Sequence, residues 1–195
     1  AEDDHRVWSA IERLAAQPPS DWTMRMLSTL LDSNVLMEQL QQWIGSGPKA
    51  RYFDNDEDTF ALSSFMCIEM NRLFQDEQVA RAFMEYAFYR IFKRLDGTPT
   101  VIYIEEAWFM LADEHFAARI DDWLRTLRKK NAFVIMATQS LAEIASCKIF
   151  SSLIDNIPNK MFLPNANAMA HMDLYTDKFS LNLAQVDRIR TAVPK

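Results

Sequence analysis

The chain contains 195 residues, enough for one domain or for part of a larger one. A net charge of −6 argues against a dominant nonspecific grip on nucleic acid, which needs a basic face, so there is no strong direct signal for nucleic-acid binding. Cys67 and Cys147 lack the spacing of metal ligands and form no disulfide framework. No apolar stretch is long enough to cross a bilayer, and from the acidic first residues we expect no signal peptide. We therefore expect a soluble, cytoplasmic protein that reaches any membrane through its partners.

Residues 1–48 are predicted to form a helical segment, because apolar residues recur there at helical spacing. The first helix ends before Pro18-Pro19. The second helix would be capped by Ser20 or Asp21, and the third runs from residue 34 to residue 44.

Residues 49–195 are predicted to form the remaining, α/β part of the same domain. Short extended pieces at 51–53 and 60–62 surround an acidic turn. A long helix capped by Asp76 follows, with Val79, Phe83, Ala87 and Ile91 on one face. The stretch 96–99 ends this helix with a glycine cap and then a proline.

From residue 100 the pattern alternates between strand and helix. A helix is expected from about residue 113 to residue 130, with its apolar residues at helical spacing: Phe116, Ile120, Leu124 and Leu127. The last helix carries Leu183, Val186 and Ile189 on one side. Short continuous apolar runs separated by helices are typical of a parallel sheet covered on both faces. Three runs have this form: 101–104, 133–136 and 161–163. The predicted fold class is therefore α/β.

An acid pair, Glu105-Glu106, ends the first of these runs. The carboxyl end of a strand in an α/β sheet opens on the ligand crevice. There the first acid could hold Mg²⁺ through water, and the second could deprotonate a water that attacks a γ-phosphate. The alternative is two exposed acids that begin a turn.

Two further groups of polar residues lie on either side of the second apolar run. Thr138-Gln139 ends the second run, where an amide could contact a phosphate or a water. The alternative is a polar pair that starts a loop. Arg128 and Lys129 lie in a basic run closed by Asn131, and one of them could reach a phosphate of its own or an adjoining subunit. The alternative is that these cations only complement the helix dipole.

The order of these groups resembles one family, the VirB-four, TrbE-like and CagE-like ATPases of type IV secretion and conjugation machines. The resemblance covers roughly residues 20–190 and is carried by three runs: Ile104-Glu105-Glu106-Ala107-Trp108-Phe109-Met110-Leu111, Leu124-Arg125-Thr126-Leu127-Arg128-Lys129-Lys130-Asn131 and Ala137-Thr138-Gln139-Ser140. It implies the C-terminal part of a RecA-like P-loop ATPase core that uses ATP and Mg²⁺. It also implies a hexamer-like homo-oligomer, peripheral at the bacterial inner membrane beside other inner-membrane components of the secretion system, where it powers pilus assembly and substrate transfer.

The resemblance also implies residue roles. Glu106 matches the catalytic acid, Glu105 the acid that holds Mg²⁺, and Gln139 the sensing glutamine. Arg128 and Lys129 match the family's basic motif. Arg128 is expected to act in catalysis, and Lys129 and Thr138 are expected to bind the nucleotide.

The phosphate-binding loop G-x-x-x-x-G-K-[ST] is absent from this sequence. The stretch 45–49 has the wrong spacing, no strand before it, and Pro48 where an N–H donor is needed, so we interpret it as a helix stop. In the family's sheet the phosphate-loop strand lies between the Thr-Gln strand and residues 160–163. We therefore expect the chain to be part of a longer protein. Two alternatives remain open: a ring DNA translocase of the HerA/FtsK group, and a non-catalytic module that docks partners.

Overall fold

The structure is a computed structural model that describes residues 2–70 and 72–193. The chain divides into two compact units, one ending at Ile91 and the other beginning at Phe92. The division predicted at residue 48 stays a prediction about the longer protein.

The first unit is helical. Its elements are α1 (Glu2–Ala15), η1 (Pro19–Asp21), α2 (Met24–Leu30), α3 (Asn34–Gln41), α4 (Ala50–Phe53), η2 (Leu73–Gln75) and α5 (Glu77–Arg94), the last of which continues past the boundary. The three predicted helices are confirmed as α1 to α3. The predicted cap of the second helix is wrong, because residues 19–21 form a separate 3-10 turn and the Thr23 side chain accepts a hydrogen bond from the Met26 N–H instead.

The extended piece predicted at residues 51–53 is wrong, because these residues lie in α4. The Asp54 carboxylate accepts hydrogen bonds from Arg25 at 2.9 and 2.7 Å and from the Gly45 N–H at 2.7 Å. These contacts with distant parts of the unit stabilise the end of α4. They cannot be predicted from the local sequence pattern. The Arg25 guanidinium and the Gly45 N–H also hold the pKa of Asp54 below its ordinary value.

The piece at residues 60–62 has no regular secondary structure. Phe60 instead packs edge-on against Phe83 and Tyr86 of α5, with ring centroids 5.8 and 5.5 Å apart. The Asp76 cap of α5 is confirmed, since its carboxylate accepts hydrogen bonds from the amides of residues 78 and 79.

The second unit contains the sheet. Its elements are β1 (Thr100–Ile104), α6 (Ala107–Ala112), α7 (Glu114–Thr126), η3 (Leu127–Lys130), β2 (Ala132–Met136), α8 (Leu141–Ser146), α9 (Phe150–Asn156), η4 (Ala168–His171), η5 (Leu174–Lys178) and α10 (Leu183–Thr191). β1 and β2 pair in parallel, from Thr100 opposite Ala132 to Ile104 opposite Met136. Helices around a parallel strand pair confirm the predicted α/β class.

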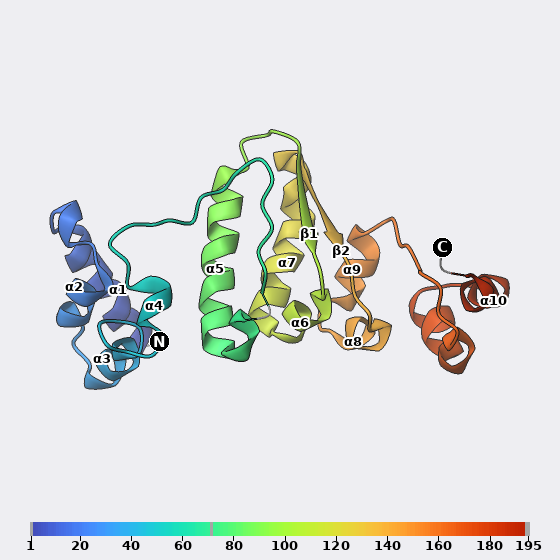
Figure 1. Ribbon diagram of the computed structural model, residues 1–195, viewed down its shortest axis with the longest axis horizontal. Coiled ribbons are helices and arrows are strands. Elements are labelled where there is room, and N and C mark those ends of the chain that lie inside the picture. Colours follow the sequence, from blue (N-terminus) through green and yellow to red (C-terminus); the bar gives the residue numbers. More distant parts are fainter. Residues whose placement is uncertain (1, 71, 194–195) are drawn as a thin grey trace. The chain divides into compact units, whose positions relative to one another are not determined.

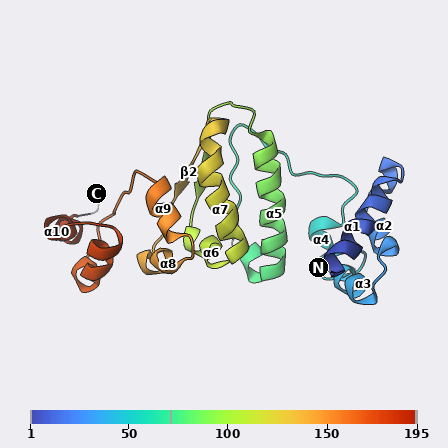
Figure 2. The same ribbon diagram turned by 180° about the vertical axis from the view of Figure 1, so that it is seen from behind.

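Helices α6 and α7 form the crossover between the two strands. Figure 1 draws β1 and β2 in front of α7, and Figure 2, from behind, draws α7 in front. The Asp113 carboxylate caps α7, and Phe116, Ile120 and Leu127 are buried as predicted. Trp123, 2% exposed, fills the core position expected for Leu124.

One face of the strand pair remains apolar and exposed within the second unit. Val101 lies opposite Phe133, and Tyr103 lies opposite Ile135. These four side chains are 46 to 59% exposed. Helices were expected on both faces of the sheet, but within this unit they cover only one face of the strand pair.

The third strand predicted at residues 161–163 is wrong. Met161 and Leu163 are 89% and 72% exposed, and the residues have no regular structure. Phe162 turns the other way and packs against Tyr175 and Phe179. A strand needs a partner for its backbone groups, and this sequence lacks the phosphate-loop strand expected beside it.

The final helix, α10, only partly follows the prediction. Val186 and Ile189 are buried, but Leu183 is 60% exposed. Leu183 is the first residue of the helix, directly after the capping residue Asn182, so the last helix buries only its later turns.

No described helix combines the length and the apolar composition that crossing a membrane requires.

Candidate functional site

The parallel register of β1 and β2 brings the acid pair beside the Thr138-Gln139 pair. The Ala137 N–H donates to the Ile104 carbonyl at 2.9 Å, and the Ala107 N–H donates to the Ala137 carbonyl at 3.0 Å. Backbone pairing thus continues past both strands and fixes the two polar loops side by side at the carboxyl end of the sheet.

Glu106 adopts a left-handed backbone conformation, with φ 51° and ψ 45°. This region is uncommon for residues other than glycine, asparagine and aspartate. Glu106 is also the N-cap residue of α6, yet its side chain makes no capping hydrogen bond to that helix. The conformation therefore leaves the carboxylate available for other partners.

Two neutral donors hold the Glu106 carboxylate, one on each oxygen. The Trp108 indole N–H donates to Oε2 at 2.7 Å, and the Gln139 amide Nε2 donates to Oε1. Since a carboxylate only accepts hydrogen bonds, the Gln139 amide must present its nitrogen, which leaves its carbonyl oxygen as a free acceptor. A water beside both groups would find two acceptors and could donate to each.

Thr138 and Glu105 lie at the same edge but do not contact Glu106. The Thr138 hydroxyl turns back into its own loop, accepting from the Ser140 N–H at 3.1 Å. Glu105 is exposed. The alternation along β1 puts it on the same face as Val101 and Tyr103, whereas Glu106 follows the other face.

Arg128 and Lys129 lie at the opposite end of the sheet. Both are exposed in η3, and Asn131, with φ 54°, ends this turn as a left-handed cap. The five residues of β2 that separate this cap from the carboxyl edge span roughly 16 Å. The structure therefore brings Gln139 to Glu106 but does not bring Arg128 or Lys129 to it within the chain.

The glycines at positions 45 and 47 do not form a phosphate cradle. A Cβ at Gly47 would lie 2.3 Å from the Gln41 carbonyl oxygen, so this glycine permits a close backbone approach. Lys49 is 9% exposed, and its ammonium donates to Gln42 and Gln78. These contacts support the interpretation of the stretch as the end of a helix.

Among residues 2–70 and 72–193, no three histidine, cysteine, aspartate or glutamate side chains gather closely enough to hold a metal ion. Mg²⁺ keeps several of its waters and needs only one or two carboxylates. Glu105, an exposed carboxylate at the carboxyl end of β1, fits that smaller demand.

Comparison with known proteins agrees with this geometry. Residues 34–191 match the family model of the TraG P-loop domain. The chain belongs to the TraG P-loop domain family.

Relatives of this TraG P-loop domain act in conjugation and secretion. It is 35% identical over 163 residues to the conjugal transfer protein TrbE of Rhizobium radiobacter, covering 82% of this chain and 20% of that protein. It is 29% identical over 198 residues to the type IV secretion system protein virB4 of Bartonella henselae, covering 100% of this chain and 25% of that protein. The chain thus spans a fifth to a quarter of these relatives, and the resemblance to the VirB-four and TrbE-like family is confirmed.

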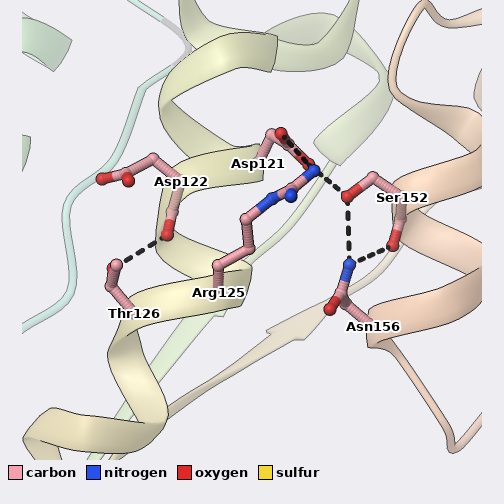
Figure 3. Close-up of polar contacts among 6 residues, drawn as sticks. All are labelled: Asp121, Asp122, Arg125, Thr126, Ser152 and Asn156. Carbon is pink, nitrogen blue, oxygen red and sulfur yellow. Dashed lines mark hydrogen bonds and ion pairs between the residues drawn. The ribbon is translucent and has the colours of Figure 1, made fainter.

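Sequence reasoning missed a polar cluster that joins helices α7 and α9 of the TraG P-loop domain (Figure 3). The Ser152 hydroxyl and the Arg125 guanidinium both donate to the Asp121 carboxylate, and the Asn156 amide donates to the Ser152 hydroxyl at 3.0 Å. Only the Asp121–Arg125 pair, four residues apart, has a sequence signal. Sequence reasoning also gave no role to Trp108. Its position two residues after Glu106 is the one sequence feature that could have indicated a contact between the two side chains.

Proposed function

We propose that this domain is the water-activating part of an ATP-hydrolysing motor in a bacterial type IV secretion or conjugation system, where it powers pilus assembly and substrate transfer. One observation carries the proposal: the Glu106 carboxylate lies at the carboxyl end of a parallel strand and is hydrogen-bonded by Gln139 from the adjacent strand. Membership of the TraG P-loop domain family supports ATP as the nucleotide.

Glu106 is the proposed general base. Its carboxylate is fixed by two donors yet retains lone pairs, so it can take a proton from a water beside it. Gln139 is the proposed sensor, because the amide that contacts Glu106 can exchange this partner for a phosphate oxygen. Thr138 holds the loop that carries Gln139.

Glu105 is the proposed Mg²⁺ ligand, acting through water. When bound, Mg²⁺ would neutralise charge that develops on the phosphates. The exposed position of Glu105, beside Glu106 but on the other face of the strand, supports this division of work between the two acids.

Arg128 and Lys129 are proposed to act on the nucleotide of a neighbouring subunit in a hexamer-like ring. They are exposed and lie at the other end of β2 from Glu106, so a role across a subunit boundary suits them better than a role in their own site. We also propose that the ring is cytoplasmic, peripheral at the inner membrane, and assembles with other components of the secretion system. The TrbE and virB4 relatives support this setting.

The deciding experiment replaces Glu106 in the full-length protein. Glu106→Gln should keep ATP binding and lower turnover by at least ~100-fold, the low end of what a positioned acid–base group contributes. Glu114→Gln is the matched control, since Glu114 is an exposed acid that pairs with Lys148. Turnover of Glu106→Gln within a few-fold of this control would refute the hydrolytic role and favour a docking module. Hydrolysis that depends on added duplex DNA would favour the HerA/FtsK type of translocase.

A further inference from the structure

The contact between Trp108 and Glu106 has a role beyond packing. We propose that Trp108 is a positioning residue: its indole N–H holds the Glu106 carboxylate in place for water activation while Gln139 exchanges partners. The proposal rests on the proposed function, because it assigns Trp108 a part in the same step.

The direction of this hydrogen bond is unambiguous. An indole N–H can only donate and a carboxylate can only accept. At 2.7 Å the contact is at the short end of the N–H···O range, as expected for a charged acceptor.

The backbone explains why Glu106 needs such a partner. In its left-handed conformation the Glu106 side chain makes no capping hydrogen bond to the first turn of α6, so the helix itself does not fix the carboxylate. Trp108 lies on α6, whose residues Ala107, Met110 and Leu111 are buried, and its ring packs edge-on against Phe109 at 5.9 Å. The donor is therefore held by a packed helix.

The two donors on Glu106 differ in what they can do. Gln139 comes from a loop and carries both a donor and an acceptor, so it can form equivalent bonds with a phosphate or a water. Trp108 has a single N–H and a ring held by packing. When Gln139 leaves Oε1, Trp108 still holds Oε2, and the carboxylate keeps its place.

The competing explanation is that Trp108 only fills space. Trp108→Phe separates the two, because it keeps an aromatic ring and removes the donor. Trp22→Phe is the matched control: the Trp22 indole also donates one hydrogen bond, to the Gln17 carbonyl at 3.0 Å, within the first unit.

The first arm of the test needs no nucleotide. Nuclear magnetic resonance of the full-length protein measures its indole N–H signals, and the Trp108 and Trp22 signals are assigned by their loss in Trp108→Phe and Trp22→Phe. Glu106→Ala removes the acceptor. The Trp108 indole signal should then shift and exchange faster with solvent, while the Trp22 signal stays unchanged. A Trp108 signal that is unaffected by Glu106→Ala would overturn the proposal. Since Glu106→Ala leaves Trp108 itself in place, a change in its indole signal reports the loss of the acceptor.

The second arm measures ATP turnover in the full-length protein. Trp108→Phe should lower kcat by about tenfold to 100-fold, the scale of a displaced catalytic group, with KM for ATP within about twofold of the parent. A kcat equal to that of Trp22→Phe would overturn the positioning role. If Glu106→Gln itself kept full turnover, the proposed function would fail instead, so the two failures are distinguishable.

Discussion

Gln139 and Glu106 are 33 residues apart in the sequence, yet the amide of one donates to the carboxylate of the other. The parallel pairing of β1 and β2 causes this meeting, because it ends both strands at the same level. Because strand pairing positions the two loops, replacing either side chain should leave the backbone of both loops in place.

Gln139→Ala should keep nucleotide binding in the full-length protein and lower turnover by at least about tenfold, since a polar group beside the reacting water is removed. Gln39→Ala is the control, because Gln39 is an exposed residue of α3. Steady-state ATPase assays compare the two. Equal activities would remove Gln139 from the mechanism.

Glu105→Gln should raise the Mg²⁺ concentration needed for half-maximal ATP hydrolysis by about tenfold, because a neutral amide attracts the metal's waters less strongly. The measurement is a Mg²⁺ titration of the variant, the parent protein and Glu114→Gln. Superimposable titrations would leave Glu105 as an acid at the end of a strand.

Arg128→Ala distinguishes a helix-end charge from a phosphate contact. Loss of the dipole interaction alone should cost ~0.3 to 1 kcal/mol of stability and leave hydrolysis unchanged. We expect hydrolysis to fall by at least about 100-fold, because a charge-assisted contact in the transition state has no substitute in water.

Mixing experiments identify the subunit that Arg128 serves. An Arg128→Ala protein combined with a Glu106→Gln protein should regain part of the activity, since some sites of a mixed ring would then contain both intact residues. A mixture as inactive as its components would contradict action between subunits.

Ser152→Ala should loosen the attachment of α9 to α7. The hydroxyl donates to the Asp121 carboxylate and accepts from Asn156, so its loss should cost about 1.5 to 3 kcal/mol, the range for a hydrogen bond to a charged group. Urea denaturation measures the change, and hydrogen exchange of the α9 amides locates it. The exposed neighbour Ser151 provides the control Ser151→Ala, which should have no comparable effect. Equal stability of the two variants would show that this cluster does not stabilise the helix pair.

Asp54→Asn should change how the stability of the first unit depends on pH. The pKa of Asp54 is lowered in the folded state, chiefly by its hydrogen bonds from Arg25. The carboxylate therefore stabilises the fold fully above the ordinary aspartate pKa of about 3.9, and this contribution is lost as the pH falls through the depressed folded value. Asp54→Asn should thus unfold more easily than the parent at pH 7, and the difference should shrink in acid.

Thermal unfolding monitored by circular dichroism at pH 7 and at lower pH tests this prediction. Glu57→Gln, at an exposed acid nearby, should follow the parent at each pH. A difference between Asp54→Asn and the parent that does not change with pH would assign the effect to packing.

The sequence predicts the arrangement at the carboxyl end of β1 and β2 well, because short-range signals determine it. Two apolar runs separated by an amphipathic helix specify a parallel strand pair, and a parallel pair places the residues after each strand together. The meeting of Glu106 with Gln139 follows from this logic. The hydrogen bond from Trp108 to Glu106 could not be predicted in this way. It depends on the left-handed backbone conformation of Glu106, and nothing in the local sequence indicates that a glutamate adopts this conformation.

The failures occur where a distant partner decides the outcome. Residues 51–53 have the composition of a strand, but the hydrogen bonds from Arg25 and Gly45 to Asp54 anchor them as part of a helix. Residues 161–163 also have strand composition, but they have no strand beside them in the described part of the chain.

The apolar face formed by Val101, Tyr103, Phe133 and Ile135 has a practical consequence for producing this segment by itself. A pair of parallel strands with an exposed apolar face and open edges is a template for aggregation, because other chains can add to it as further strands. In a cell, such a polypeptide would occupy chaperones and attract proteases unless something covers that surface soon after synthesis. Charged substitutions at Tyr103 and Phe133 should therefore improve the yield of the separate segment, and the same substitutions would be expected to harm any longer protein that buries this surface.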